Sequence, residues 1–104
     1  MSLPDWDAAK VRQIQASGGR AVIKFWAPWC GPCKALAPVV EAAAAQHPDT
    51  VFGQVNLDEQ PEVGRLFGVR GLPTIIGLEN GGVVWNQVGL IPANALETRL
   101  TKWR

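Results

Sequence analysis

The chain has 104 residues, of which 47% are hydrophobic and 18% are charged, and its formal net charge is +1. This length suffices to bury a core, so we expect one domain spanning residues 1–104. The small net charge and the scattered lysines and arginines argue against a nucleic-acid-binding surface. No apolar run is long enough to span a membrane, and the N-terminus lacks the pattern of a secretory signal. Two cysteines are too few for a disulfide framework and favour catalytic use in a reducing compartment.

The first predicted element is a helix that begins close to the N-terminus. We expect Ser2 or Asp5 to cap it, with Pro4 in its first turn. Apolar residues at helical spacing continue to Ile14, and the pair Gly18-Gly19 ends the helix.

An apolar run, Ala21-Val22-Ile23-Lys24-Phe25-Trp26-Ala27, predicts a buried central strand over residues 20–27. After Pro28 come two cysteines, Cys30 and Cys33, with two residues between them. The alanine-rich segment that follows predicts a helix from about residue 30 to the pair His47-Pro48, bent at Pro38. The two cysteines therefore lie where a central strand passes into the N-terminus of a helix.

This placement of the cysteines favours redox chemistry. Residues three apart on a helical turn are neighbours, so the two sulfurs can form a disulfide. The positive end of the helix dipole stabilises a Cys30 thiolate, whereas Cys33, one turn further in, is shielded and suited to resolving a mixed disulfide. A structural disulfide that closes so short a loop would contribute little to stability, because it restricts the unfolded chain only slightly. Zinc needs four ligands, more than two cysteines and His47 supply, and we expect His47 to be a solvated cation.

The second half of the chain predicts a strand over residues 51–57, a short helix over 61–67 and a hairpin of residues 74–79 and 83–88. Asn80-Gly81-Gly82 forms the hairpin turn, and a last helix spans about 92–102. If Glu79 pairs with Val83, Gly77 lies opposite Trp85, and the indole covers the bare glycine backbone. Strands that alternate with helices and end in a hairpin predict an α/β protein with helices on both faces of a mixed sheet.

The segment Trp29-Cys30-Gly31-Pro32-Cys33-Lys34 resembles the active site of the thioredoxin family. The resemblance covers nearly the whole chain. It includes further family motifs at Pro38, Val55-Asn56-Leu57-Asp58, Gly71-Leu72-Pro73-Thr74, Asn80-Gly81-Gly82 and Val88-Gly89. It implies the thioredoxin fold, a central mixed sheet sandwiched by helices. The family has a strand before the first helix, but few residues precede that helix here, so we expect this strand to be vestigial or absent.

The resemblance also implies a function, the reduction of protein disulfides. Cys30 would attack the substrate disulfide and Cys33 would release the product. A flavoprotein reductase linked to NADPH would then restore the dithiol, with no cofactor or metal bound to this chain. The family further implies a cytoplasmic monomer and a cis peptide bond before Pro73. The residues expected to contact substrate are Trp29, Gly31, Pro32, Gly71, Leu72, Pro73, Gly89 and Leu90.

Two other functions stay open from the sequence. The chain could be a disulfide oxidant or isomerase, although Gly31-Pro32 between the cysteines resembles the reductases. It could also be a docking subunit of a partner enzyme, whose redox centre is incidental. Among the aromatic residues near the cysteines, we expect Trp29 to be partly exposed and to contact substrate, and Trp26 to lie in the core.

Lys24 departs from the family pattern. The family usually has an aspartate at this strand position, buried behind the second cysteine, and often a lysine where Gln54 stands. A lysine in an apolar strand is costly unless its amine finds a partner or reaches water. Two interpretations therefore stay open: the amine reaches solvent at the edge of the sheet, or it replaces the carboxylate in handling the proton of Cys33.

Overall fold

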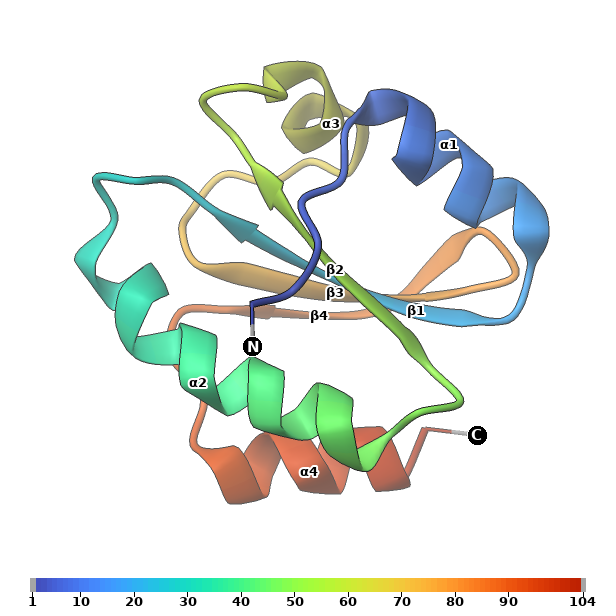
Figure 1. The fold of residues 1–104 in the computed structure, drawn as a ribbon, viewed down its shortest axis with the longest axis vertical. Helices are drawn as coiled ribbons and strands as arrows, with labels where there is room; N and C mark the ends of the chain where they lie inside the picture. The colour runs from blue at the N-terminus through green and yellow to red at the C-terminus, as the bar shows by residue number, and fades with distance from the viewer. Residues whose placement is uncertain (1, 104) are drawn as a thin grey trace.

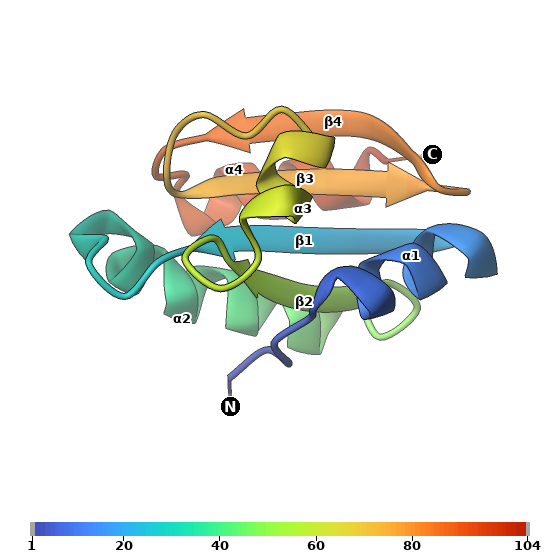
Figure 2. The same cartoon turned by 90° about the horizontal axis from the view of Figure 1, so that it is seen from above.

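The computed structural model describes residues 2–103, in which helices and strands pack as two helical layers around one sheet (Figures 1 and 2). The sheet order is β2-β1-β3-β4, with β1 parallel to β2 and the other neighbouring pairs antiparallel. Helices α1 and α3 lie on one face, and α2 and α4 on the other. This arrangement confirms the predicted α/β architecture. The elements are α1 (Ala8–Ser17), β1 (Arg20–Trp26), α2 (Gly31–Gln46), β2 (Val51–Asn56), α3 (Pro61–Leu66), β3 (Thr74–Glu79), β4 (Gly82–Val88) and α4 (Ala93–Thr101).

The central strand β1 divides the core into two halves because its side chains alternate between the faces of the sheet. Val22 packs among the residues of α2 and α4, whereas Ile23 and Phe25 pack on the opposite side with α1 and α3. All three side chains are fully buried. By the same alternation, Lys24 faces α2 rather than α1.

The segment before α1 is extended and runs beside β2. Trp6 N donates to Gln54 O at 2.7 Å, and Gln54 N donates to Pro4 O at 2.9 Å. These hydrogen bonds form one isolated parallel bridge, between Asp5 and Gln54. The expected first strand is therefore present only as a vestige. The same pairing makes the predicted cap of α1 wrong. Residues 4–6 are held by β2, and the helix begins later, with Asp7 accepting from Lys10 N at 2.8 Å.

The β3–β4 hairpin turns through Asn80 (φ 52°) and Gly81 (φ 87°), left-handed conformations that Asn and Gly tolerate best. The predicted pairing of Glu79 with Val83 is wrong, because Glu79 pairs with Gly82. A bulge between Gly77 and Leu78 then shifts the register by one residue. Gly77 consequently does lie opposite Trp85, and a Cβ added to this glycine would overlap the indole.

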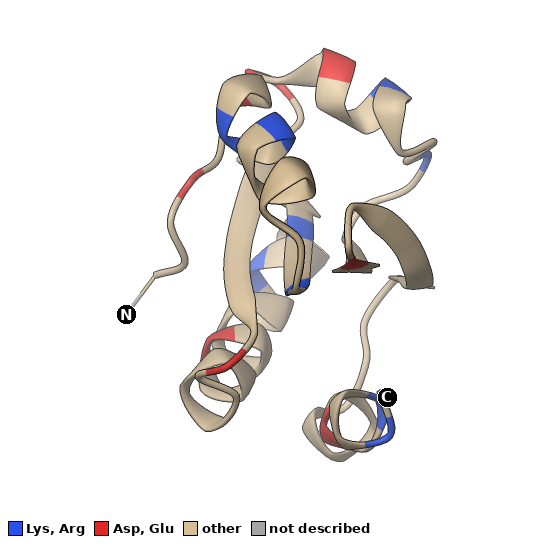
Figure 3. Ribbon diagram, turned by 90° about the vertical axis from the view of Figure 1, so that its right-hand side faces the viewer, with Lys and Arg blue, Asp and Glu red and all other residues tan. Residues whose placement is uncertain are grey.

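Charged positions are interspersed over the helices, strands and loops, as Figure 3 shows. His47, at the end of α2, is half-buried and pairs with Glu97 of α4, with 2.8 Å between Nε2 and Oε2. The expectation that His47 is solvated is therefore wrong, because its ring is largely covered and is paired with Glu97. In the described part of the chain, no helix combines the length and apolar character needed to cross a bilayer.

Replacing Gly77 with alanine should destabilise the protein, because the new methyl group takes space that the Trp85 indole occupies. We expect a loss of about 1–3 kcal/mol in the free energy of unfolding, as for other overpacked positions. Urea denaturation of a double-mutant cycle checks the cause: in the Trp85→Ala background the cost of Gly77→Ala should largely disappear. An equal cost in both backgrounds would show that the indole is not responsible.

Candidate active site

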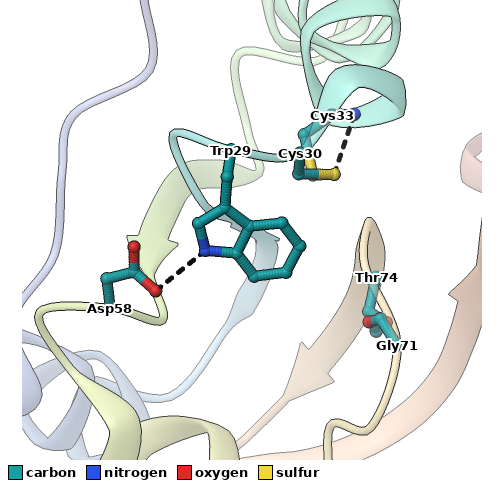
Figure 4. Close-up of a disulfide and its surroundings, with 6 residues drawn as sticks. All are labelled: Trp29, Cys30, Cys33, Asp58, Gly71 and Thr74. Carbon is teal, nitrogen blue, oxygen red and sulfur yellow. Dashed lines mark hydrogen bonds between the residues drawn. A yellow bond between two sulfur atoms is a disulfide. The ribbon is translucent and has the colours of Figure 1, made fainter.

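Cys30 is the N-cap of α2 and Cys33 lies in the first turn of that helix, bonded to Cys30 as a disulfide (Figure 4). The Cα atoms of the two residues are 5.3 Å apart. Cys30 Sγ accepts from Cys33 N at 3.2 Å, so this sulfur occupies the place that a capping oxygen takes in other helices. Pro32 stands in the first turn, where its missing N–H costs no hydrogen bond. The strand-to-helix junction therefore places the Cys30 sulfur at the N-terminus of α2, where the N–H of Cys33 reaches it.

Both cysteines are covered in the disulfide form. Cys30 is 4% exposed and Cys33 is 2% exposed, with Trp26 and Leu72 packed against them. The shielding predicted for Cys33 is present, but Cys30 is covered almost as well. Their expected difference in reactivity therefore depends on the helix N-terminus rather than on exposure.

The loop before β3 faces the disulfide (Figure 4) and contains a cis peptide bond between Leu72 and Pro73, as expected. Thr74 Oγ1 donates to Gly71 O at 2.6 Å and closes the loop on itself. Gly89 N donates to Pro73 O at 2.8 Å, which joins the end of β4 to the same loop. Two segments that the family resemblance predicted to contact substrate are thus brought together.

Trp29 is 70% exposed beside the disulfide, and its indole extends toward Asp58 (Figure 4). Nε1 of Trp29 donates to Asp58 Oδ1 at 3.1 Å, and Asp58 N donates to Asn56 Oδ1 at 2.9 Å. The indole is therefore oriented by the loop after β2, an interaction that the sequence analysis missed. Leu90, 57% exposed, adds a second apolar side chain from the segment after β4.

Lys24 is buried, with 3% of its surface exposed, so the interpretation that its amine reaches solvent at the sheet edge is wrong. It lines a cavity of about 170 Å³ together with Cys33 and Glu41. Burial lowers the pKa of Lys24, because the charged form loses its water, while the carboxylates of Glu41 and Asp5 act in the opposite direction. Gln54 pairs with Lys24 in the sheet, but its Nε2 donates to Asp5 Oδ1 at 2.9 Å.

Glu41 is a candidate functional residue that the sequence analysis missed. It stands on α2, eight residues after Cys33, and it shares the cavity of Lys24. The sequence did contain one signal for it, because residues 33, 37 and 41 are spaced by four and so lie on one face of the predicted helix. Nothing in the sequence indicated that Lys24 faces the same side.

A sequence model of the thioredoxin family matches residues 6–102. The chain belongs to the thioredoxin family. It is 39% identical over 97 residues to thioredoxin 1 of Synechococcus elongatus, covering 92% of this chain and 91% of that protein. The solved thioredoxin of Plasmodium falciparum has a TM-score of 0.90 at 28% identity, covering 98% of this chain and 100% of that one. The thioredoxin of Malassezia sympodialis has a TM-score of 0.88 at 30% identity, covering 98% of this chain and 93% of that one.

Family membership and the cysteine pair together define the chemistry. The chain has the thioredoxin fold, and Cys30 and Cys33 are bonded at the start of α2. A pair of cysteines that can alternate between dithiol and disulfide carries two electrons. This thioredoxin is therefore a thiol–disulfide oxidoreductase.

In the reduced protein, Cys30 should react faster with iodoacetamide than Cys33. The N-terminus of α2 stabilises the thiolate of Cys30, and the thiolate is the reactive form. Brief alkylation followed by mass mapping of the peptides measures the two rates. Preferential labelling of Cys33 would reverse the assigned order of the two thiols.

Replacing Lys24 with methionine should raise the free energy of unfolding of the oxidised protein by about 1 kcal/mol near neutral pH, because a buried charge is removed. The carboxylates left behind keep solvent contact, since Asp5 is exposed and Glu41 is half-buried. Because the folded-state pKa of Lys24 is lowered, the unfolded chain binds more protons between that pKa and the ordinary lysine value of about 10.4. Wild-type stability should therefore rise with pH across this interval, and the advantage of Lys24→Met should shrink.

Urea denaturation at several pH values checks this expectation. Lys10→Met, at an exposed position of α1, serves as the matched control and should change stability little at any pH. If Lys24→Met is no more stable than the wild type, or if the difference in their free energies of unfolding does not change with pH, the buried ammonium does not destabilise the protein as we expect.

Proposed function

We propose that this thioredoxin reduces disulfide bonds in other proteins. The Cys30 thiolate attacks one sulfur of the substrate disulfide, forming a mixed disulfide and releasing the first substrate thiolate. Cys33 then attacks Cys30, which releases the second substrate thiolate and forms the Cys30–Cys33 bond. Two electrons and two protons pass from the dithiol to the substrate. The observation that carries the proposal is the Cys30–Cys33 pair at the N-terminus of α2, facing the Pro73 loop.

The surroundings of the disulfide suit a polypeptide substrate. Trp29 and Leu90 offer exposed apolar surface, and Gly31 and Pro32 are exposed next to the sulfurs. Gly71, Leu72, Pro73 and Gly89 form the opposite wall, tied together by the hydrogen bond from Gly89 N to Pro73 O. An extended peptide can lie against such a wall and bring its disulfide to Cys30.

The oxidised protein needs a source of electrons. We assign this task to a flavoprotein thioredoxin reductase that uses NADPH, with no cofactor held by this chain. The proposed setting is the cytoplasm, where thiol pools stay reduced, and the proposed active form is the monomer.

Lys24 has a proposed part in the second step. Its side chain and Cys33 line the same cavity, so it is placed to handle the proton that Cys33 loses before attacking Cys30. A nearby ammonium also favours the thiolate and thus the reduced form of the pair. This effect makes the centre more oxidising. The observation that favours a second candidate function, a disulfide oxidant or isomerase, is therefore the burial of Lys24 beside Cys33.

Replacement of both cysteines with serine separates a reductase from a docking subunit. A reductase without its cysteines loses its disulfide-reducing activity. A subunit that only binds a partner enzyme would still support that enzyme. Reduction of insulin disulfides with dithiothreitol as electron donor measures the first activity. We expect the wild type to accelerate insulin reduction and the Cys30→Ser, Cys33→Ser double variant to give only the uncatalysed rate. A double variant as active as the wild type would exclude the redox mechanism.

The reduction potential of the Cys30–Cys33 pair decides the direction of electron flow. A reductase must lie below the glutathione poise, on the order of −220 to −260 mV by extraction methods, so that it stays a net electron donor. Equilibration in glutathione buffers, with the two redox forms separated after alkylation, gives the value. A potential well above this range would favour the oxidant or isomerase.

A further inference from the structure

The cavity beside Cys33 is large and polar enough to hold water. Its volume is about 170 Å³, and one water needs only about 10–15 Å³ of such space. Nε1 of Trp26, which lines the cavity, is buried and has no hydrogen-bond partner among the described residues. Buried polar groups of this kind are usually satisfied by ordered water. The cavity wall includes Lys24, Trp26, Cys33, Ala37, Glu41 and Gln54.

Glu41 lies on the same face of α2 as Cys33, two steps of four residues further along. Eight residues correspond to about 12 Å along a helix, too far for direct contact. Helical side chains tilt toward the N-terminus of their helix, so we expect the Glu41 side chain to be directed toward Ala37 and Cys33, which line the same cavity. Ala37 has only a methyl group, and the space above it is part of the cavity. Water can therefore connect the carboxylate to the thiol.

The charges around the cavity make Glu41 the better proton acceptor. Burial lowers the pKa of Lys24, but the carboxylates of Glu41 and Asp5 oppose this effect and favour the ammonium form. In that form Lys24 offers donors but no acceptor. An ionised carboxylate only accepts. Asp5 and Lys34 are exposed at the cavity rim or beyond it, so bulk water screens them.

We propose that Glu41 accepts the proton of Cys33, through water in this cavity, when Cys33 resolves the mixed disulfide. Lys24 positions the carboxylate and stabilises the thiolate that forms. The inference rests on the proposed reductase function and names the proton acceptor for its second step. Glu41 acts through water and not by touching the sulfur, so it is a positioning residue of the reaction.

The Cys33 thiol gives its proton to water in the cavity, and the Glu41 carboxylate takes up one proton. The resulting Cys33 thiolate attacks Cys30 Sγ, forming the Cys30–Cys33 bond as the bond from Cys30 to the substrate sulfur breaks. The electron pair leaves on the substrate sulfur, which takes a proton from solvent, and Glu41 returns its own proton to solvent.

Single-turnover reduction of 5,5′-dithiobis(2-nitrobenzoate) by the reduced protein tests the proposal. Attack by Cys30 releases the first thionitrobenzoate, and resolution by Cys33 releases the second. We expect Glu41→Gln to slow the second release on the order of tenfold at neutral pH, less than the 10²–10⁴-fold typical of a directly placed acid–base group, because water still reaches the thiol. The first release should be unchanged. The slowing should disappear at high pH, where Cys33 ionises without a base.

The sign of the effect separates a base from a mere charge. If Glu41 acted only by its charge, its removal would favour the Cys33 thiolate and speed the second release. An unchanged or faster second phase in Glu41→Gln therefore overturns the proposal, whereas partial recovery in Glu41→Asp supports it. Glu62→Gln, an exposed position on α3, is the control for charge and should leave both phases as in the wild type.

A second variant tests the water path without changing any charge. Ala37→Leu fills the cavity and should slow the second release while sparing the first. Ala42→Leu, at an exposed position of α2, is the matched control and should slow neither phase. Normal kinetics in Ala37→Leu would contradict a path through this cavity. If the wild type releases no thionitrobenzoate at all, the reductase function itself fails, which is a different result.

Discussion

The backbone of β1 is hydrogen-bonded to β2 along one edge and to β3 along the other, while helices cover both of its faces. A strand held in this way cannot slip by one residue, because a slip would turn Lys24 into the apolar core under α1 and α3 and would turn Ile23 toward α2. The end of β1 therefore has a fixed position. Cys30 follows four residues after that end and caps α2, so the stability of the central pairing fixes where the disulfide lies.

The register of the sheet also explains why distant segments meet at the disulfide. Phe25, near the end of β1, pairs with Thr74 at the start of β3, and Thr74 pairs with Val88 at the end of β4. The Pro73 loop and Gly89 consequently lie at the same end of the sheet as Cys30. The hydrogen bond from Gly89 N to Pro73 O then holds the two segments together. The approach of these two segments is thus a consequence of antiparallel pairing, which places the start of one strand beside the end of the next.

Lys24 places a basic group at the buried cavity beside Cys33. Its position in β1 turns it toward α2, where desolvation penalises the ammonium and the carboxylates of Glu41 and Asp5 oppose that penalty. The usual family arrangement has the acid on the strand. Here the strand carries the base, and the acid stands on the helix. The polar groups still surround one cavity beside Cys33, so proton transfer remains possible with the two charges exchanged between elements.

The sequence by itself determined the elements whose signals are local. The apolar run of β1, the Cys-Gly-Pro-Cys segment and the Asn80-Gly81 turn each depend on neighbouring residues, and the structure has all three where they were predicted. Only the tertiary structure decided the cap of α1, the bulge opposite Trp85 and the burial of Lys24. Asp5 looked like a cap until β2 held its backbone in an extended form, and Glu41 joined the site only because α2 packs across β1. These outcomes depend on residues far apart in the chain, and local spacing carries no information about which faces of distant elements come together.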